Sequence, residues 1–155
     1  MLRRFKMEDE KNNNVNVLDE INKGATMGMD AIEYVSEKVG DPQFRDVLNI
    51  EYDKYNDIAN RINNIYPKYA NKEPHETGKM AKMMTWYGIQ MNTMNDKSNS
   101  KISELLMQGT NMGIIEGRRL LNQNHNDNIN EEVKQLLNDF VVMQEDSVET
   151  LKKYL

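Results

Sequence analysis

The chain contains no cysteine, and this absence excludes whole classes of chemistry. Disulfide scaffolds, zinc ribbons, iron–sulfur clusters and thiol nucleophiles all require that residue. Histidine is nearly as scarce, since His75 and His125 are the only two in 155 residues. Most catalytic metal sites and acid–base sites depend on histidine. The sequence therefore supports no particular reaction, and we expect a protein that is not an enzyme.

Long apolar runs are also missing. No segment approaches the roughly 18 apolar residues that a membrane-spanning helix needs. The basic start is followed by a charged, Asn-rich stretch, where a secretory signal would have an apolar core. With 20 Lys and Arg against 25 Asp and Glu, the net charge of −5 argues against nucleic acid as a partner. We expect a cytoplasmic protein in which residues 1–14 are disordered and residues 15–155 form one domain.

What the sequence does have is helical periodicity. Apolar residues recur every three or four positions from about 15 to 39, and Gly40-Asp41-Pro42 then ends one helix and starts another. No hairpin turn joins two alternating runs, so we expect no strands and an all-α class. The further helices predicted by the periodicity cover 42 to about 66, 76 to about 95, 100 to 123, and 130 to the C-terminus.

A short glycine motif occurs in two of these helices. Gly24-Ala25-Thr26-Met27-Gly28 matches Gly109-Thr110-Asn111-Met112-Gly113, and Gly117 extends the second strip by one helical turn. The repeat predicts two helix hairpins, with residues 67–99 as the crossover between them. A glycine inside a helix costs roughly 1 kcal/mol relative to alanine. We expect the compensation to be close packing of the first and third bundle helices along these strips, with a groove for a ligand or partner helix as the alternative.

Carboxylates are the remaining candidates for metal ligands. Glu51 falls on the apolar stripe of the second helix, Glu116 lies beside the glycine strip, and Glu20 lies on the first helix. The favoured interpretation is that these are solvated flank positions, so we expect no cofactor, with iron held by carboxylates as the alternative. A core-facing Glu51 would need a partner. Its neighbours in the sequence offer three candidates: Tyr52, Tyr55 and Lys54.

Methionine is abundant, with 12 in the chain and seven between Met80 and Met112. Thioethers fill cores and form adaptable contact surfaces, and they also bind Cu(I), which is the alternative cofactor. The apolar residues of 80–94 lie all round a helix, so packing one face on the bundle leaves apolar area exposed. We therefore expect a protein partner or a second copy to contact a surface made by Met83, Met84, Trp86 and Tyr87.

The chain resembles the ferritin-like superfamily, and more narrowly its bacterial families built from two helix hairpins. The resemblance is carried by Leu18 to Val39 with its glycine and Ala31-Ile32, by Asp41-Pro42 followed by Phe44-Arg45-Asp46-Val47-Leu48, and by the repeated helix at 102–121. It implies a four-helix bundle of two hairpins with an additional crossover helix, over residues 15–155.

The same resemblance bears on function. Members that bind iron use carboxylates and Glu-x-x-His pairs. Neither His75 nor His125 has a glutamate three positions before it, so no metal residue carries over. The resemblance therefore implies a non-catalytic bundle that acts as a structural or protein-interaction module. The alternatives are a carboxylate-based metal-binding or iron-handling protein and a structural protein like those of spore coats.

Overall fold

The computed structural model describes residues 2–71, 74, 88, 90, 95–124 and 128–155, and every regular element in these ranges is helical. The all-α class expected from the periodicity is therefore confirmed. A short 3-10 helix, η1 (Tyr66–Lys68), follows the second long helix. The long helices are α1 (Leu2–Ser36), α2 (Pro42–Ile65), α4 (Asn99–Gln123) and α5 (Glu131–Lys152).

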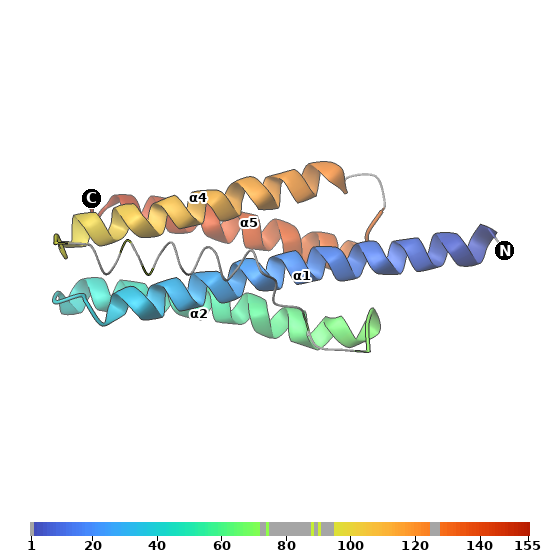
Figure 1. The fold of residues 1–155 in the computed structure, drawn as a ribbon, viewed down its shortest axis with the longest axis horizontal. Helices are drawn as coiled ribbons and strands as arrows, with labels where there is room; N and C mark the ends of the chain where they lie inside the picture. The colour runs from blue at the N-terminus through green and yellow to red at the C-terminus, as the bar shows by residue number, and fades with distance from the viewer. Residues whose placement is uncertain (1, 72–73, 75–87, 89, 91–94, 125–127) are drawn as a thin grey trace.

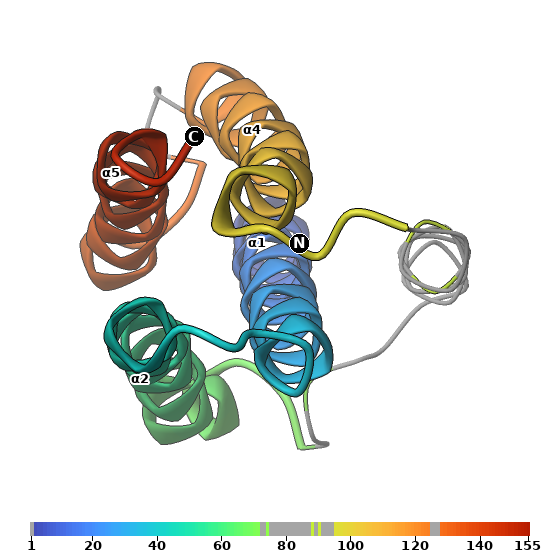
Figure 2. The same cartoon turned by 90° about the vertical axis from the view of Figure 1, so that its left-hand side faces the viewer.

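The long helices lie side by side along one axis, as Figure 1 shows. α1 and α5 run in one direction, and α2 and α4 run in the other. The most extensive contacts are within the two hairpins, α1–α2 and α4–α5. Seen end-on in Figure 2, α1 lies between α2 and α4, while α5 completes the group beside α2 and α4.

The helix ends follow local signals in the sequence. The side chain of Asp41 caps α2 by accepting from the backbone N–H of Gln43, and Pro42 occupies the first turn. Ser98 caps α4 in the same way, accepting from the N–H of Lys101. These boundaries lie within a few residues of those that the sequence predicts.

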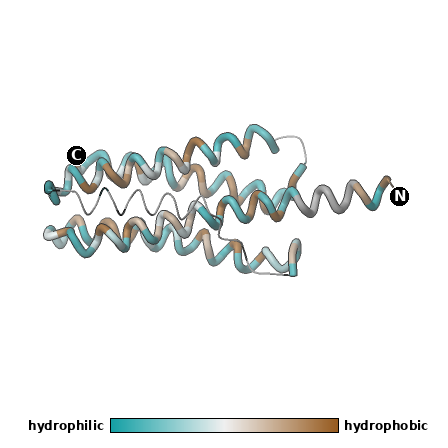
Figure 3. Tube along the Cα trace, in the orientation of Figure 1, coloured by the Kyte–Doolittle hydropathy of each residue, from teal (hydrophilic) through white to brown (hydrophobic). Residues whose placement is uncertain are grey.

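The core is formed by apolar side chains from all four long helices. Figure 3 shows apolar segments recurring along each helix and alternating with polar ones, as amphipathic helices require. Burying each large apolar side chain contributes about 1.5–3 kcal/mol. None of the helices in the described ranges combines the length and apolarity that a membrane crossing needs. The fully buried apolar side chains include Leu18, Ile21, Phe44, Leu48, Ile62, Ile102, Leu105, Leu136 and Leu137.

The N-terminal helix is longer than the sequence analysis predicts. α1 begins at Leu2, so residues 2–14, which we expected to be disordered, continue the helix and extend beyond the other helices in Figure 1. No proline or glycine occurs before Gly24, so nothing in this stretch stops a helix. Asn14 is 2% exposed, and its side-chain oxygen accepts from the backbone N–H of Asn130 at the start of α5, at 2.8 Å. That contact anchors this part of α1 to the second hairpin.

Most of the helix expected at 76–95 falls outside the described residues. The same is true of Met83, Met84, Trp86 and Tyr87, the residues proposed for a partner surface. These expectations therefore stay predictions.

Polar side chains join the two hairpins where α2 ends and α5 begins. The hydroxyl of Tyr69 donates to Glu132 and accepts from the side-chain amide of Asn130 at 3.1 Å, and Lys68 pairs with Glu132 at 3.0 Å. Burial, followed by the bond to Glu132, raises the pKa of Tyr69 to about 12. The same bond, together with Lys68, lowers the pKa of Glu132. The folded state is therefore stabilised by the ionised form of Glu132.

Replacing Tyr69 by phenylalanine should weaken the protein in a pH-dependent way. Tyr69→Phe removes the hydroxyl and should return the pKa of Glu132 towards 4.5, its ordinary value. A carboxyl whose pKa is lowered by folding contributes stability above its ordinary pKa and loses that contribution as the pH falls through the lowered one. The loss of melting temperature in Tyr69→Phe should therefore be larger at about pH 7 than at about pH 3. Tyr34→Phe, at an exposed tyrosine, is the control. An equal loss at both pH values would contradict the argument.

Candidate functional site

A cavity of about 410 Å³ lies inside the bundle, with all four long helices contributing to its wall. Most of the side chains around it are apolar, among them Ile21, Leu48, Leu106, Leu137 and Phe140. The volume lies within the roughly 300–1,000 Å³ that is usual for sites of small molecules. We call this space the bundle cavity.

The bundle cavity reaches the protein surface where its lining residues are exposed. Its most exposed lining residues, Met112, Ile115 and Glu116, lie on α4. On α1, Glu20 also lines the cavity and is partly exposed. The opening is therefore bordered by apolar and acidic side chains.

The glycines of both strips line this cavity: Gly24, Gly28, Gly109, Gly113 and Gly117. A Cβ atom on Gly24 would lie 2.7 Å from Cζ of Phe140, and one on Gly28 would lie 2.5 Å from Cε1 of Tyr55. A Cβ on Gly113 would collide with Nε2 of Gln144, and one on Gly117 with Cγ2 of Val141. Four of the glycines thus receive side chains of α2 and α5, whereas the sequence analysis expects the two strips to pack against each other.

The two copies of the glycine motif also make equivalent contacts in the structure. Gly28 and Gly113 are equivalent positions of the motif, and each receives a side chain from the second helix of its own hairpin. Tyr55 follows the first residue of α2 by 13 positions, and Gln144 follows the first residue of α5 by the same 13. Aligning the two helix starts would have marked Tyr55 and Gln144 as a pair.

Buried polar groups lie among these apolar walls. Burial raises the pKa of Tyr55, side-chain hydrogen bonds with Thr110 and Gln144 act to lower it, and the charge of Glu51 raises it further. Thr110 donates its own hydroxyl to the backbone oxygen of Leu106, at 2.8 Å. Gln144 is 2% exposed, and its Oε1 has no hydrogen-bond partner among the residues that the structure describes. An unpaired buried acceptor costs about 1–3 kcal/mol, so this atom calls for an explanation.

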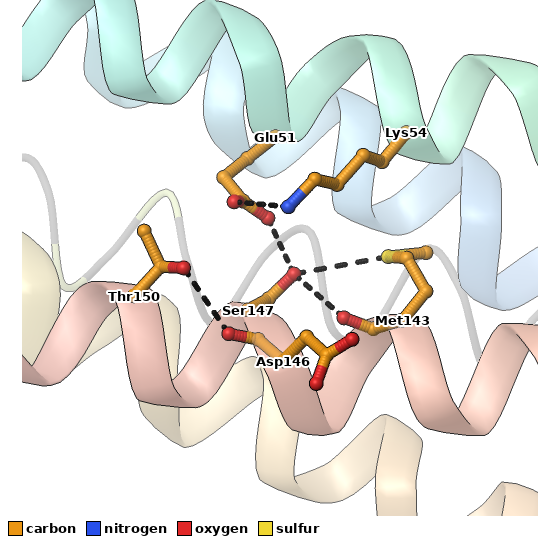
Figure 4. Close-up of polar contacts among 6 residues, drawn as sticks. All are labelled: Glu51, Lys54, Met143, Asp146, Ser147 and Thr150. Atoms are coloured by element: carbon orange, nitrogen blue, oxygen red, sulfur yellow. Dashed lines mark hydrogen bonds and ion pairs between the residues drawn. The ribbon is translucent and has the colours of Figure 1, made fainter.

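Glu51 is the carboxylate whose inward position the sequence indicates, and it is 3% exposed. Figure 4 shows it pointing from α2 towards α5, where the hydroxyl of Ser147 donates to its Oε2. Lys54, one turn further along α2, donates to Oε1 at 2.9 Å. Lys54 is one of the three partners that the sequence offers. Ser147 gives no such signal, because it is distant in sequence and lies in an ordinary amphipathic stretch.

All three candidate carboxylates line the cavity, yet each is paired along its own helix. Among the described residues, no three His, Asp or Glu side chains lie close enough together to hold a metal ion. A cation three residues later draws each carboxylate along the helix surface and away from a shared centre. The pairs are Glu20 with Lys23, Glu51 with Lys54, and Glu116 with Arg119.

In comparisons with known proteins, no family model matches the chain, and no curated protein or solved structure matches it. The assignment of function therefore depends on the site itself.

Adding one methyl group at Gly28 should destabilise the bundle. Gly28→Ala places a carbon against three ring atoms of the buried Tyr55, so the ring must shift. We expect a loss of about 1–3 kcal/mol in the free energy of unfolding, measured by urea denaturation, despite the better helix propensity of alanine. Gly40→Ala is the matched control, because nothing lies within 4 Å of a Cβ there. If Gly28→Ala and Gly40→Ala have the same free energy of unfolding, the packing of Tyr55 against Gly28 does not need a glycine at that position.

Removing the hydroxyl of Ser147 should cost more than removing a neighbouring one. Ser147→Ala leaves one oxygen of the buried Glu51 carboxylate without its donor, and hydrogen bonds to charged groups contribute about 1.5–3 kcal/mol. Thr150→Ala, one turn later on α5, removes an exposed hydroxyl that donates to the backbone oxygen of Asp146 (Figure 4). We expect a change within about 0.5 kcal/mol for this control. Equal losses in thermal denaturation would show that Ser147 does not support Glu51.

Proposed function

We propose that this chain is a non-catalytic helical bundle that acts as a binding module, with the bundle cavity as its binding site. The observation that carries this proposal is the cavity of about 410 Å³, walled mainly by apolar side chains. Exposed Met112 and Ile115 border its opening. Largely apolar cavities with a few polar groups are typical of binding sites, and exposed apolar side chains grouped together mark contact surfaces.

The order and directions of the helices support a ferritin-like arrangement for this module. Ferritin-like bundles consist of two hairpins joined by one long crossover. Here α2 and α4 run in the same direction, and the end of α2 lies at the opposite end of the bundle from the start of α4 (Figure 1). A cytoplasmic location is part of the proposal and rests on the sequence alone.

The site favours binding over metal chemistry. Among the described residues, Glu51 is the one buried carboxylate, and both of its oxygens have donors, Lys54 and Ser147. A carboxylate-based iron site needs several such groups that face one another with oxygens free for the metal. The ion pair and the hydroxyl instead fix Glu51 as part of the wall of a binding cavity.

A charge at the rim of the cavity should weaken the binding of an apolar probe. Nile red is a neutral fluorophore that brightens in apolar surroundings, and we expect it to bind saturably at one site per chain. Ile115→Glu, at the opening, should weaken this binding roughly tenfold, which corresponds to about 1.4 kcal/mol. Ile50→Glu is the matched control, because Ile50 is 58% exposed against 56% for Ile115 but does not line the cavity.

Both variants alter exposed positions, so their melting temperatures should stay close to that of the wild type. Equal affinities for the two variants would overturn the assignment of the site. A wild-type protein without saturable binding would overturn the proposed function.

A further inference from the structure

We infer that the bundle cavity takes a small apolar molecule that carries a hydrogen-bond donor at one end, and that Oε1 of Gln144 accepts this hydrogen bond. The inference rests on the proposed function, because it names the class of ligand for the same site.

The first argument is the position of the Gln144 side chain. It lines the cavity, it is 2% exposed, and no group in the described part of the chain is hydrogen-bonded to its Oε1. The side chain is packed between the helices of its hairpin, because its amide nitrogen lies against Gly113. An acceptor held in this way without a donor is costly, and a donor on a bound ligand would recover that cost.

The second argument is that the neighbouring polar groups are already satisfied. Thr110 donates to Leu106, and Ser147 donates to Glu51, whose other oxygen accepts from Lys54. Among the described residues of this lining, Oε1 of Gln144 is the buried side-chain oxygen that has no partner at all. Because the remaining wall is mainly apolar, the ligand needs an apolar body and a single donor group.

The third argument is the charge around the cavity. Three carboxylates line it, namely those of Glu20, Glu51 and Glu116, and the cation in the lining, Lys23, is paired with Glu20 at 3.1 Å. An anionic head group would find carboxylates nearby and no unpaired cation in this lining. An alcohol or an alkylammonium group fits, whereas a carboxylate does not.

A series of ligands with the same alkyl chain separates these possibilities. Octanol and octylammonium have donors, octyl methyl ether has an oxygen but no donor, and octanoate is an anion. Each would compete with Nile red, which has no hydrogen-bond donor, for the wild-type protein. We expect octanol and octylammonium to displace the dye at concentrations about tenfold lower than the ether and octanoate, a difference of about 1.4 kcal/mol.

The variant Gln144→Met tests the residue itself. Methionine keeps the length of the side chain and removes the acceptor, so octanol should lose its advantage over the ether when both displace Nile red from the variant. Gln108→Met, at an exposed glutamine on α4, is the control and should keep the preference for octanol. Retention of that preference in Gln144→Met would overturn the inference.

Displacement of Nile red from the wild-type protein by the four ligands tests the inference even if Gln144→Met does not fold. Saturable binding of Nile red with equal displacement by octanol and the ether would overturn the inference and leave the proposed function standing. If octanoate displaces the dye as effectively as octanol does, the inference is also overturned and the proposed function still stands. Failure of Nile red to bind saturably would overturn both.

Discussion

The bundle depends on the absence of a side chain at two equivalent positions, Gly28 and Gly113. A Cβ at either would occupy the space that Tyr55 or Gln144 fills, so each hairpin packs through its glycine. The cost of roughly 1 kcal/mol for a glycine in a helix interior is offset by burial of a large side chain from the neighbouring helix. The same glycines line the bundle cavity, so the constraint that closes each hairpin also shapes the space between the two.

The polar groups of the cavity follow from that packing. Tyr55 and Gln144 enter the bundle at equivalent positions of the repeat, but one carries a hydroxyl and the other an amide. Among the described residues, Oε1 of Gln144 has no donor. Ser103 Oγ is also buried without a partner among the described residues, but only Gln144 of the two lines the cavity. A buried acceptor without a partner lowers stability, and a bound donor would remove that cost.

The three carboxylates of the cavity wall pair with cations that lie three residues later on the same helix. The pair whose members are both exposed, Glu116 with Arg119, adds only about 0–1 kcal/mol to stability. The contacts that join the hairpins are of another kind. Asn14 and Tyr69 link the hairpins where α5 begins, and the hydrogen bond from Ser147 to Glu51 links them again at the wall of the cavity.

The sequence by itself determined the local features: the all-α class, the helix boundary at Asp41-Pro42, the start of a helix near residue 100, and three candidate partners for Glu51 that include Lys54. Each depends on residues within a few positions, which periodicity and capping make readable. The tertiary structure decided which side chains contact one another between helices. Side chains of α2 and α5 fill the glycine sites, Ser147 completes Glu51, and Asn14 anchors a helix that begins at Leu2. These pairings join residues far apart in the chain, and they depend on the angle and distance between helices, which no local pattern encodes.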